Sequence, residues 1–274
     1  MSRRDNKMDV SYQLAIGGIA ALALLILVGP VAIVLLSSLT DSQTLSFPPK
    51  GLSLRWYQQL FDAQRSAPIH AAAGHSVSVA LVAAGTAVLL GTCAALGLQA
   101  QPSARWSRGL LAFFLSPLVL PGISFGLSAL MFFSLLGLEP SLTLIVAGHL
   151  VMIVPFVLRT TTSSLLQLDR GLLESSAILG ASQWYGFRRI TLPLIAPGIA
   201  AGAFMATMAS MDNVPVSLFL ADAETDMLPI RMWGMMESTL DVRVAAVSGV
   251  LIVCVLLLML VMERAVGLTK RIQG

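Results

Sequence analysis

Long apolar runs alternate with short polar segments along this chain. Each run has a length that suits a membrane-spanning α-helix, which needs about 20 apolar residues. Six such runs occupy residues 12–39, 75–100, 110–138, 142–165, 194–220 and 244–262. The pattern therefore predicts an all-α, polytopic membrane protein with six transmembrane helices. Because no repeat or low-complexity tract divides the sequence, residues 1–274 are expected to form a single transmembrane domain.

Helix-breaking residues interrupt the third run. Pro117, Pro121 and Gly122 lie near its middle and predict a break there, because proline cannot donate the helical hydrogen bond. The polar stretch 40–74 contains the aromatic, amphipathic segment WYQQLF at 56–61, which is expected at the outer membrane face.

Composition agrees with this interpretation. The chain is 56% hydrophobic and only 11% charged, whereas soluble domains carry about 25% charged residues. With an even number of spans, 12 of the 17 basic residues fall on one side of the membrane: Arg3, Arg4, Lys7, Arg105, Arg108, Arg159, Arg170, Arg188, Arg189, Arg264, Lys270 and Arg271. The positive-inside rule makes that side cytoplasmic, and with it both termini. The net charge of +3 thus reflects topology and needs no nucleic-acid partner.

The same count places the segment 167–193 in the cytoplasm, between the fourth and fifth runs. Asp169 is a candidate N-cap for a first short helix, and Gly180 is expected to end or kink it. A second short helix is predicted over residues 182–189, stopped before Pro193. The segment therefore predicts a helix-turn-helix hairpin at the inner membrane surface.

This hairpin carries a spaced motif. Glu174 is followed by Gly180 six residues later, and nine further residues separate Gly180 from the sequence Ile190-Thr191-Leu192-Pro193. The spacing resembles the cytoplasmic E-A-A-x3-G-x9-I-x-L-P loop of ABC importer permeases.

Two positions depart from the family form. Ser175 and Ser176 stand where the family has alanines, but both side chains are small, so close packing is preserved. The resemblance covers essentially the whole chain, and the stretch 210–251 looks like the polyamine-type permeases of this superfamily.

The resemblance implies a role and a set of partners. The loop residues Glu174, Ser175, Ser176, Gly180, Ile190, Leu192 and Pro193 would form the contact that couples this chain to an ATPase. Two ATPase subunits, a second and different permease subunit, and a periplasmic substrate-binding protein would complete an importer in the bacterial inner membrane. The solute would be a polyamine or another small amine-bearing molecule. An aminophosphonate or an oxyanion is the alternative.

No bond chemistry is expected of this chain. Its three lysines complete no G-x4-G-K-[ST] phosphate loop, so ATP and Mg²⁺ would be used by the partner ATPase. We assign no catalytic residue, no metal site and no bound cofactor, since the two cysteines have no ligands at metal-binding spacing.

Three polar residues inside apolar runs are candidates for the substrate pathway. Asp212 could neutralise an ammonium group and Asn213 could hydrogen-bond to it, because a carboxylate in a span usually faces protein or water. The alternative is that Asp212 is an interfacial residue or an ion-pair partner of Arg231. His149 in the fourth run is either a substrate ligand or a hydrogen-bonded interhelical residue.

Two other function classes remain open. A secondary transporter would show paired repeats and several buried charges, and only Asp212 stands out here. The sequence Gly122-Ile123-Ser124-Phe125-Gly126 matches the G-x-S-x-G nucleophile elbow of hydrolases. That motif requires a strand–turn–helix context, whereas this one lies inside a predicted span.

Overall fold

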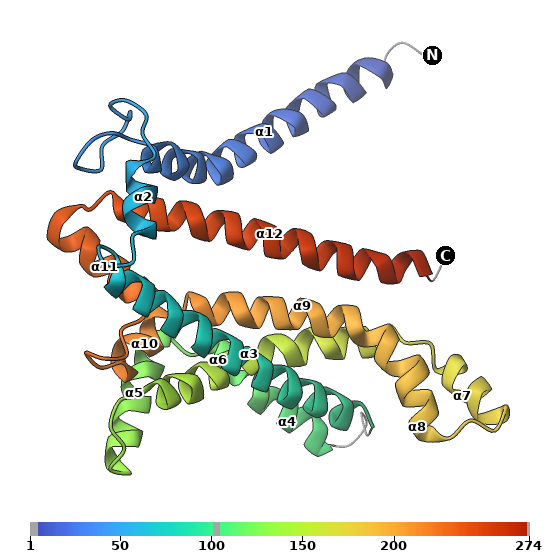
Figure 1. Cartoon of the computed structure of the whole chain (residues 1–274). Helices are drawn as coiled ribbons and strands as arrows, with labels where there is room; N and C mark the ends of the chain where they lie inside the picture. Colours follow the sequence, from blue (N-terminus) through green and yellow to red (C-terminus); the bar gives the residue numbers. More distant parts are fainter. Residues whose placement is uncertain (1–4, 101–104, 273–274) are drawn as a thin grey trace. The chain divides into compact units, whose positions relative to one another are not determined.

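The computed structural model describes residues 5–100 and 105–272, and the secondary structure in these ranges is helical apart from two isolated β-bridges (Figure 1). This confirms the all-α class. Five of the described helices are long and apolar enough to cross a membrane, and a bent helix pair provides a sixth candidate span. Arg3 and Arg4, counted above as cytoplasmic, lie outside the described residues.

The chain divides into two compact units, each described here by itself. Unit 1 comprises Met1–Ala67 and Gly234–Leu256, and unit 2 comprises Pro68–Trp233 and Leu257–Gly274. Unit 1 holds the helices α1 (Asp5–Ser38) and α2 (Arg55–Phe61), the end of α11 (Leu228–Thr239) and the first part of α12 (Arg243–Ile272).

Unit 2 contains most of the remaining helices. In chain order these are α3 (Ala67–Ala100), α4 (Arg105–Leu115), η1 (Ser116–Val119), α5 (Gly122–Leu135), α6 (Leu142–Leu166), α7 (Arg170–Ile178), α8 (Gln183–Gly186), η2 (Phe187–Thr191), α9 (Leu192–Met211) and α10 (Val214–Leu220). The short turns η1 and η2 are a 3₁₀-helix and a π-helix.

The third predicted run is broken where its prolines indicated. Residues 106–119 and 122–135 form two apolar helical stretches that meet at an angle of 105°. Pro117 lies in the first turn of η1, and Pro121 has the extended backbone of an N-cap just before α5. A pair bent this sharply is either one broken span or a re-entrant segment.

The fifth predicted run is also two helices, and this break was not predicted. The helix α9 ends at Met211, Asp212 is its C-cap, and Asn213 is the N-cap of α10. Pro215 accounts for the break, because it lacks the N–H that would bond to the Met211 carbonyl and its ring clashes with that carbonyl. The side-chain oxygen of Asn213 instead accepts a hydrogen bond from the Val216 N–H at 3.3 Å.

The most extensive helix pairing in unit 2 joins α6 to α9, which lie side by side (Figure 1). The buried face of α9 repeats every three or four residues as Ile195, Gly198, Gly202, Ala206 and Ser210. A methyl group added at Gly202 would come within 2.8 Å of the Val157 Cα atom on α6. Small residues thus let the two backbones approach closely, as is usual between helices in lipid.

Paired carboxylates accompany most of the basic residues predicted on the outer side. Arg55 pairs with Asp41, Arg65 with Asp62, Arg231 with Asp226 and Arg243 with Asp241. Each acid lies close in sequence to its arginine, so these segments carry little net positive charge. Lys50 completes the predicted outer set and is exposed.

We predict that Gly202→Val destabilises the protein. The branched side chain would meet the α6 backbone, and overpacking of this kind costs about 1–3 kcal/mol. The apparent melting temperature of the detergent-solubilised protein should fall by about 5 °C. Gly97→Val is the matched control, because a Cβ at exposed Gly97 in α3 would have no neighbour within 4 Å. Equal melting temperatures for the two variants would contradict the close α6–α9 contact.

Candidate functional site

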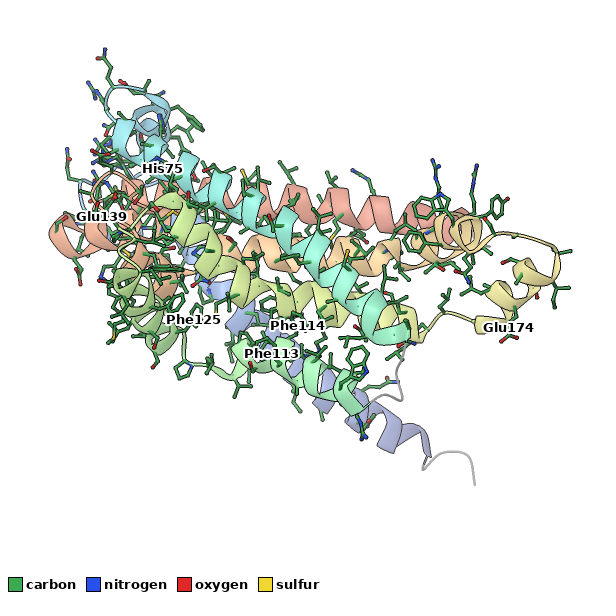
Figure 2. The ribbon with its side chains drawn as sticks, turned by 90° about the horizontal axis from the view of Figure 1, so that it is seen from below. His75, Phe113, Phe114, Phe125, Glu139 and Glu174 are labelled. Carbon is green, nitrogen blue, oxygen red and sulfur yellow. The ribbon has the colours of Figure 1, made fainter. Side chains whose placement is uncertain are left out.

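The segment 167–193 folds into the expected hairpin, built from α7, α8 and η2. As predicted, the Asp169 carboxylate caps α7 by accepting a hydrogen bond from the Gly171 N–H at 2.9 Å. Figure 2 shows Glu174 in this hairpin at the opposite end of unit 2 from His75 and Glu139. Between them runs α3, which is long and apolar enough to cross a membrane.

Gly180 ends α7 in a Schellman motif. Its N–H bonds to the Ala177 carbonyl and the Ala181 N–H bonds to the Ser176 carbonyl, both at 3.0 Å. Gly180 has φ +81°, a left-handed conformation that glycine adopts without steric cost. The glycine of the motif is therefore required by the backbone of the turn.

The second arm of the hairpin packs back on the first. The Ser182 hydroxyl accepts a hydrogen bond from the Tyr185 N–H at 3.3 Å and so caps α8. Buried Gly186 faces Leu173 and Ser176 of α7, where even a Cβ would be in van der Waals contact. Sequence reasoning missed Gly186, and its only signal was a second glycine placed six residues after Gly180.

The outer surface of the hairpin is exposed and largely apolar. Glu174 and Ser175 are exposed beside Ile178 and Leu179, which are each 86% exposed, and Trp184, which is 67% exposed. A carboxylate beside exposed apolar side chains is suited to a protein partner that carries a basic residue next to an apolar groove.

The hairpin does not stop before Pro193, contrary to the prediction. One π-helical turn, η2, runs directly from α8 into α9, and residues 183–211 form one continuous apolar helix long enough to cross a membrane. Pro193 is tolerated because it lies in the first turn of α9, where a missing N–H costs least. Ile190 is half-buried in η2, whereas Leu192 and Pro193 are exposed.

Glu174 also lines a cavity of about 390 Å³ at this end of unit 2. The other lining residues come from the ends of α3 and α6 and from the hairpin itself: Leu96, Gln99, Ala100, Leu165, Leu168, Leu173 and Thr191. All the residues predicted to couple this chain to an ATPase lie in the hairpin or in the first turn of α9. They are Glu174, Ser175, Ser176, Gly180, Ile190, Leu192 and Pro193.

His149 is a fully buried interhelical residue. Its Nδ1 atom lies 2.8 Å from the Ser210 hydroxyl of α9, and its Nε2 atom lies 3.0 Å from the Ser217 hydroxyl of α10. Both ring nitrogens are therefore engaged, and they hold α6 against both sides of the α9–α10 break.

Asp212 is exposed at that break. It does not pair with Arg231, whose guanidinium lies 3.7 Å from the Asp226 carboxylate. Asn213, by contrast, uses its side chain as the α10 cap. Asp212 and Asn213 stand at the far end of α9 from the hairpin, and the 20-residue helix separates the two groups by about 30 Å.

The loop after α10 is organised by an aspartate. Asp222 accepts hydrogen bonds from the Thr225 hydroxyl and from the Thr225 and Glu224 N–H groups, at 2.8–2.9 Å. These bonds, that from the Thr225 hydroxyl first, hold the pKa of the Asp222 carboxyl below its usual range. Asp222 thus has a turn-forming role.

The G-x-S-x-G sequence has a packing role. Ser124 is exposed within the helix α5, and no β-strand precedes it in the described part of the chain. Gly126 approaches Pro215 so closely that an added Cβ would lie 2.7 Å from the Pro215 carbonyl oxygen. The glycines therefore let α10 pack closely on α5. His149, the histidine that follows the motif in sequence, is hydrogen-bonded to Ser210 and Ser217 instead. Within the described residues, no group of three His, Cys, Asp or Glu side chains could hold a metal ion.

Residues 87–270 match the family described as the binding-protein-dependent transport system inner membrane component. The chain is 29% identical over 231 residues to the spermidine/putrescine transport system permease protein PotC of Escherichia coli K12, covering 84% of this chain and 86% of PotC. It is 29% identical to the putrescine permease PotI of the same strain, over 74% of this chain and 73% of PotI. It is 28% identical to the putative 2-aminoethylphosphonate permease PhnV of Salmonella typhimurium LT2, over 86% and 87%.

Solved structures of ABC transporters share the fold. A chain of a bacterial importer of the acidic polysaccharide alginate superposes with a TM-score of 0.63 at 14% identity, over 99% of this chain and 100% of that one. A chain of the MetNI methionine transporter in an inward-facing conformation gives a TM-score of 0.57 at 19% identity, over 71% and 93%.

We predict that Gly180→Pro removes coupling, because proline cannot adopt φ +81° or donate the bond to Ala177. Gly180→Ala should give a milder loss, because a left-handed alanine costs about 1 kcal/mol. Coupling is measured as the ratio of solute uptake to ATP hydrolysis by the reconstituted transporter.

Gly137→Ala is the matched control. Gly137 has φ +71° in the turn between α5 and α6, next to Glu139 and far from the hairpin. It carries the same backbone cost, so it should lower stability without changing the ratio of solute transported to ATP hydrolysed. If the Gly180 variants also keep the wild-type ratio of solute transported to ATP hydrolysed, the turn has no coupling role.

Proposed function

Because the chain belongs to the binding-protein-dependent transport system inner membrane components, we propose that it carries a small amine-bearing solute of the polyamine kind across the bacterial inner membrane. It is the transmembrane permease subunit of an ABC importer. The single observation that carries the proposal is the exposed hairpin that contains Glu174 and Gly180 and continues directly into a helix long enough to span a membrane. The similarity to PotC and PotI supports the substrate class.

The importer would be an assembly in which other chains supply the energy and the first recognition step. Two ATPase subunits bind ATP and Mg²⁺ and hydrolyse the ATP, and this chain performs no bond chemistry. A second, different permease subunit completes the pathway, and a periplasmic binding protein delivers the solute. Both termini lie in the cytoplasm, on the side of the hairpin, in keeping with the basic residues on that side.

The geometry suggests how motion passes through this subunit. An ATPase that closes around ATP displaces the hairpin, whose two arms are held together by the packing at Gly186. Since η2 and α9 continue the second arm without a loop, the displacement reaches α9 as a movement of one rod. The glycine face of α9, which carries Gly198 and Gly202, passes the displacement to α6. The pathway then opens alternately to either side of the membrane.

The solute would meet the polar residues at the far end of this rod. Asp212 is exposed and has no ion pair among the described residues, so it can neutralise a passing ammonium group. Asn213 and His149 belong to the same wall, where they position the α9–α10 break around the pathway.

An aminophosphonate or oxyanion solute is the alternative, supported by the similarity to PhnV. An uptake screen with putrescine, spermidine, 2-aminoethylphosphonate and sulfate decides between them. A secondary transporter would move solute without ATP, so uptake by this chain alone, in vesicles lacking an ATPase, would refute the importer assignment.

Charge reversal at Glu174 tests the coupling contact. We expect Glu174→Lys to lower uptake at least tenfold while the ATPase stays active, since breaking an interfacial charge pair costs about 2–5 kcal/mol. Glu139→Lys makes the same change at the opposite end of unit 2 and should keep uptake near wild type (Figure 2). Normal coupled uptake by Glu174→Lys would rule out the contact.

Neutralisation of Asp212 tests the pathway. We expect Asp212→Asn to slow uptake of a cationic solute about tenfold, because one charge-assisted hydrogen bond contributes about 1.5–3 kcal/mol. Glu224→Gln removes an exposed charge from the loop between α10 and α11 and serves as the control. If both variants transport a radiolabelled polyamine at the wild-type rate, Asp212 has a structural role only.

A further inference from the structure

The cavity next to the hairpin contains polar groups that have no partner in the protein. It has a volume of about 390 Å³ and lies within unit 2, between the ends of α3 and α6, the helix α7 and the turn η2. Small-molecule sites usually have volumes of about 300–1,000 Å³. The cavity is thus large enough to hold a small molecule next to the Glu174 carboxylate.

The turn η2 contributes the most informative of these groups. Thr191 is only 7% exposed and lines the cavity, yet its hydroxyl has no hydrogen-bond partner among the described residues. A threonine hydroxyl in a helix often donates to a carbonyl of the preceding turn, as that of Thr207 does to Ala203 at 2.8 Å. The Thr191 oxygen is accessible, whereas the unpaired oxygen of Thr161 in α6 is covered by the protein. A nearly buried hydroxyl that is both unpaired and accessible is suited to a ligand.

Two further polar groups line the same cavity. The Glu174 carboxylate is exposed and makes no ion pair or hydrogen bond with any described residue. Gln99 of α3 is half-buried, and its side-chain amide is likewise unpaired among the described residues. The C-terminal end of α6 reaches the cavity through Leu165 and Leu168, and a helix C-terminus carries partial negative charge. None of the described lining residues is basic, so the cavity favours a cation.

The rest of the wall is apolar and favours a cation that carries a carbon chain. Its larger side chains are four leucines: Leu96, Leu165, Leu168 and Leu173. An ammonium group has three N–H donors, and the carboxylate of Glu174, the hydroxyl of Thr191 and the amide oxygen of Gln99 are three acceptors. A carbon chain attached to that ammonium would be buried against the leucines. An alkylamine therefore uses both parts of the wall, whereas an inorganic cation uses one.

The same residues disfavour an amine that carries a phosphate. In an ethanolamine phospholipid or in 2-aminoethylphosphonate, an anionic group lies close to the ammonium along a short carbon chain. That anion would be held near the Glu174 carboxylate, and no arginine or lysine among the described lining residues could receive it. The cavity therefore selects a free alkylamine over an aminolipid and over an aminophosphonate.

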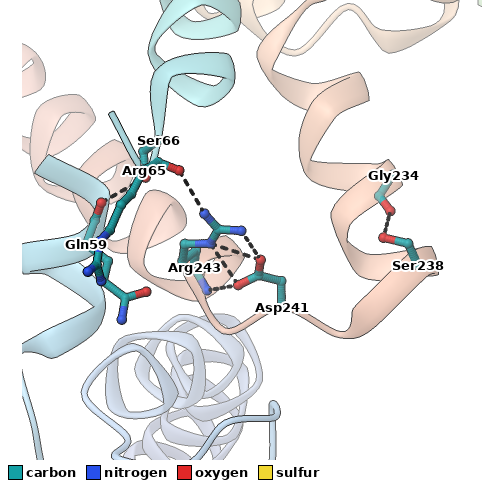
Figure 3. A network of polar contacts seen from close by, with 7 residues as sticks. All are labelled: Gln59, Arg65, Ser66, Gly234, Ser238, Asp241 and Arg243. Carbon is teal, nitrogen blue, oxygen red and sulfur yellow. Dashed lines mark hydrogen bonds and ion pairs between the residues drawn. The ribbon is translucent and has the colours of Figure 1, made fainter. Parts of the chain in front are cut away.

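A second cavity, in unit 1, does not have this capacity. Its volume is about 540 Å³, and its lining residues are Gln43, Trp56, Gln59, Arg65, Asp241 and Arg243. The carboxylate in this lining, Asp241, is already engaged by Arg243, whose Nη2 atom lies 2.6 Å from Oδ2 and whose Nε atom donates to both oxygens (Figure 3). Because an ammonium group would meet two arginines here, we expect amine binding at the cavity with Glu174 and not at this one.

We infer that the cavity next to the hairpin binds a free alkylamine of the transported class from the cytoplasm, and that the bound amine competes with the ATPase for Glu174. The inference rests on the proposed function, which brings the amine to this side of the membrane and gives Glu174 its ATPase contact. A carboxylate that is paired with an ammonium group attracts a basic residue of the ATPase less strongly. Transport therefore slows as the amine accumulates in the cytoplasm.

Binding is tested with the complete importer in nanodiscs of phosphatidylcholine and phosphatidylglycerol. The periplasmic binding protein is omitted because it would bind the amine itself, and every variant also carries Asp212→Asn to remove the pathway carboxylate. In equilibrium dialysis with radiolabelled putrescine, Glu174→Gln and Thr191→Val should each raise the dissociation constant about tenfold. Glu139→Gln and Thr207→Val make the same changes at residues that do not line the cavity, and both should bind as the Asp212→Asn parent does.

Two further measurements define the site. Butylamine should bind about tenfold more tightly than ethylamine, because it buries two more methylene groups against the leucines. Thr191→Val should keep the melting temperature of the parent, because the hydroxyl that it removes has no partner in the protein. An unchanged melting temperature separates lost binding from misfolding.

Competition is tested in inside-out proteoliposomes, in which the hairpin and the ATPase face the medium. A labelled polyamine and the binding protein are enclosed, and external ATP drives the polyamine out. Unlabelled putrescine in the medium should slow this transport at least twofold in the otherwise unmodified importer. Thr191→Val should need about tenfold more putrescine for the same inhibition, while its rate without external putrescine stays at the wild-type value.

Several outcomes would overturn the inference. One is binding by Glu174→Gln and Thr191→Val that equals binding by the controls, and another is equal affinity for ethylamine and butylamine. A third is displacement of putrescine when phosphatidylethanolamine is added to the nanodiscs, because the cavity would then be an aminolipid site. If the wild-type importer moves no polyamine, the proposed function fails. If it moves polyamine normally and external putrescine at saturating concentration has no effect, the inference about the cavity fails alone.

Discussion

The close contact between α6 and α9 is the interaction on which the rest of unit 2 depends. In lipid there is no hydrophobic gain from pressing two apolar helices together, so association relies on van der Waals packing at short distance. Gly198 and Gly202 provide that distance, and Ala206 and Ser210 continue the same face. His149 then joins α6 to both α9 and α10 by side-chain hydrogen bonds. A membrane helix pair held this tightly can move as one body.

The hairpin gains its importance from the way it is attached. Capped by Asp169 and Ser182 and closed by Gly180, it is a small rigid element made from local hydrogen bonds. It enters α9 through a π-helical turn, without a flexible linker. Force applied to the hairpin is therefore delivered along the glycine face of α9 toward the break at Asp212, about 30 Å from the hairpin.

Local signals in the sequence predicted the all-α class, the N-cap at Asp169, the end of the helix at Gly180 and the break near Pro117, because each depends on a few neighbouring residues. The break at Asp212 could have been inferred from Pro215, whose effect on the preceding turn is equally local. Helix α11 was missed because it is short and lies in a polar connection. The polar cavity of unit 1 could not be predicted at all, since its lining residues Trp56, Arg65 and Asp241 meet only through tertiary folding.

The π-helical turn also sets the direction in which the hairpin points around the axis of α9. A π turn contains one residue more than the α-helical path that it replaces, and each residue of an α-helix advances the chain by about 100° around its axis. The rotation of the hairpin turn at Gly180 relative to the glycine face of α9 is thus set by the one extra residue in 187–191. Gain or loss of that residue would re-aim the hairpin around the helix axis and leave every contact inside the membrane unchanged.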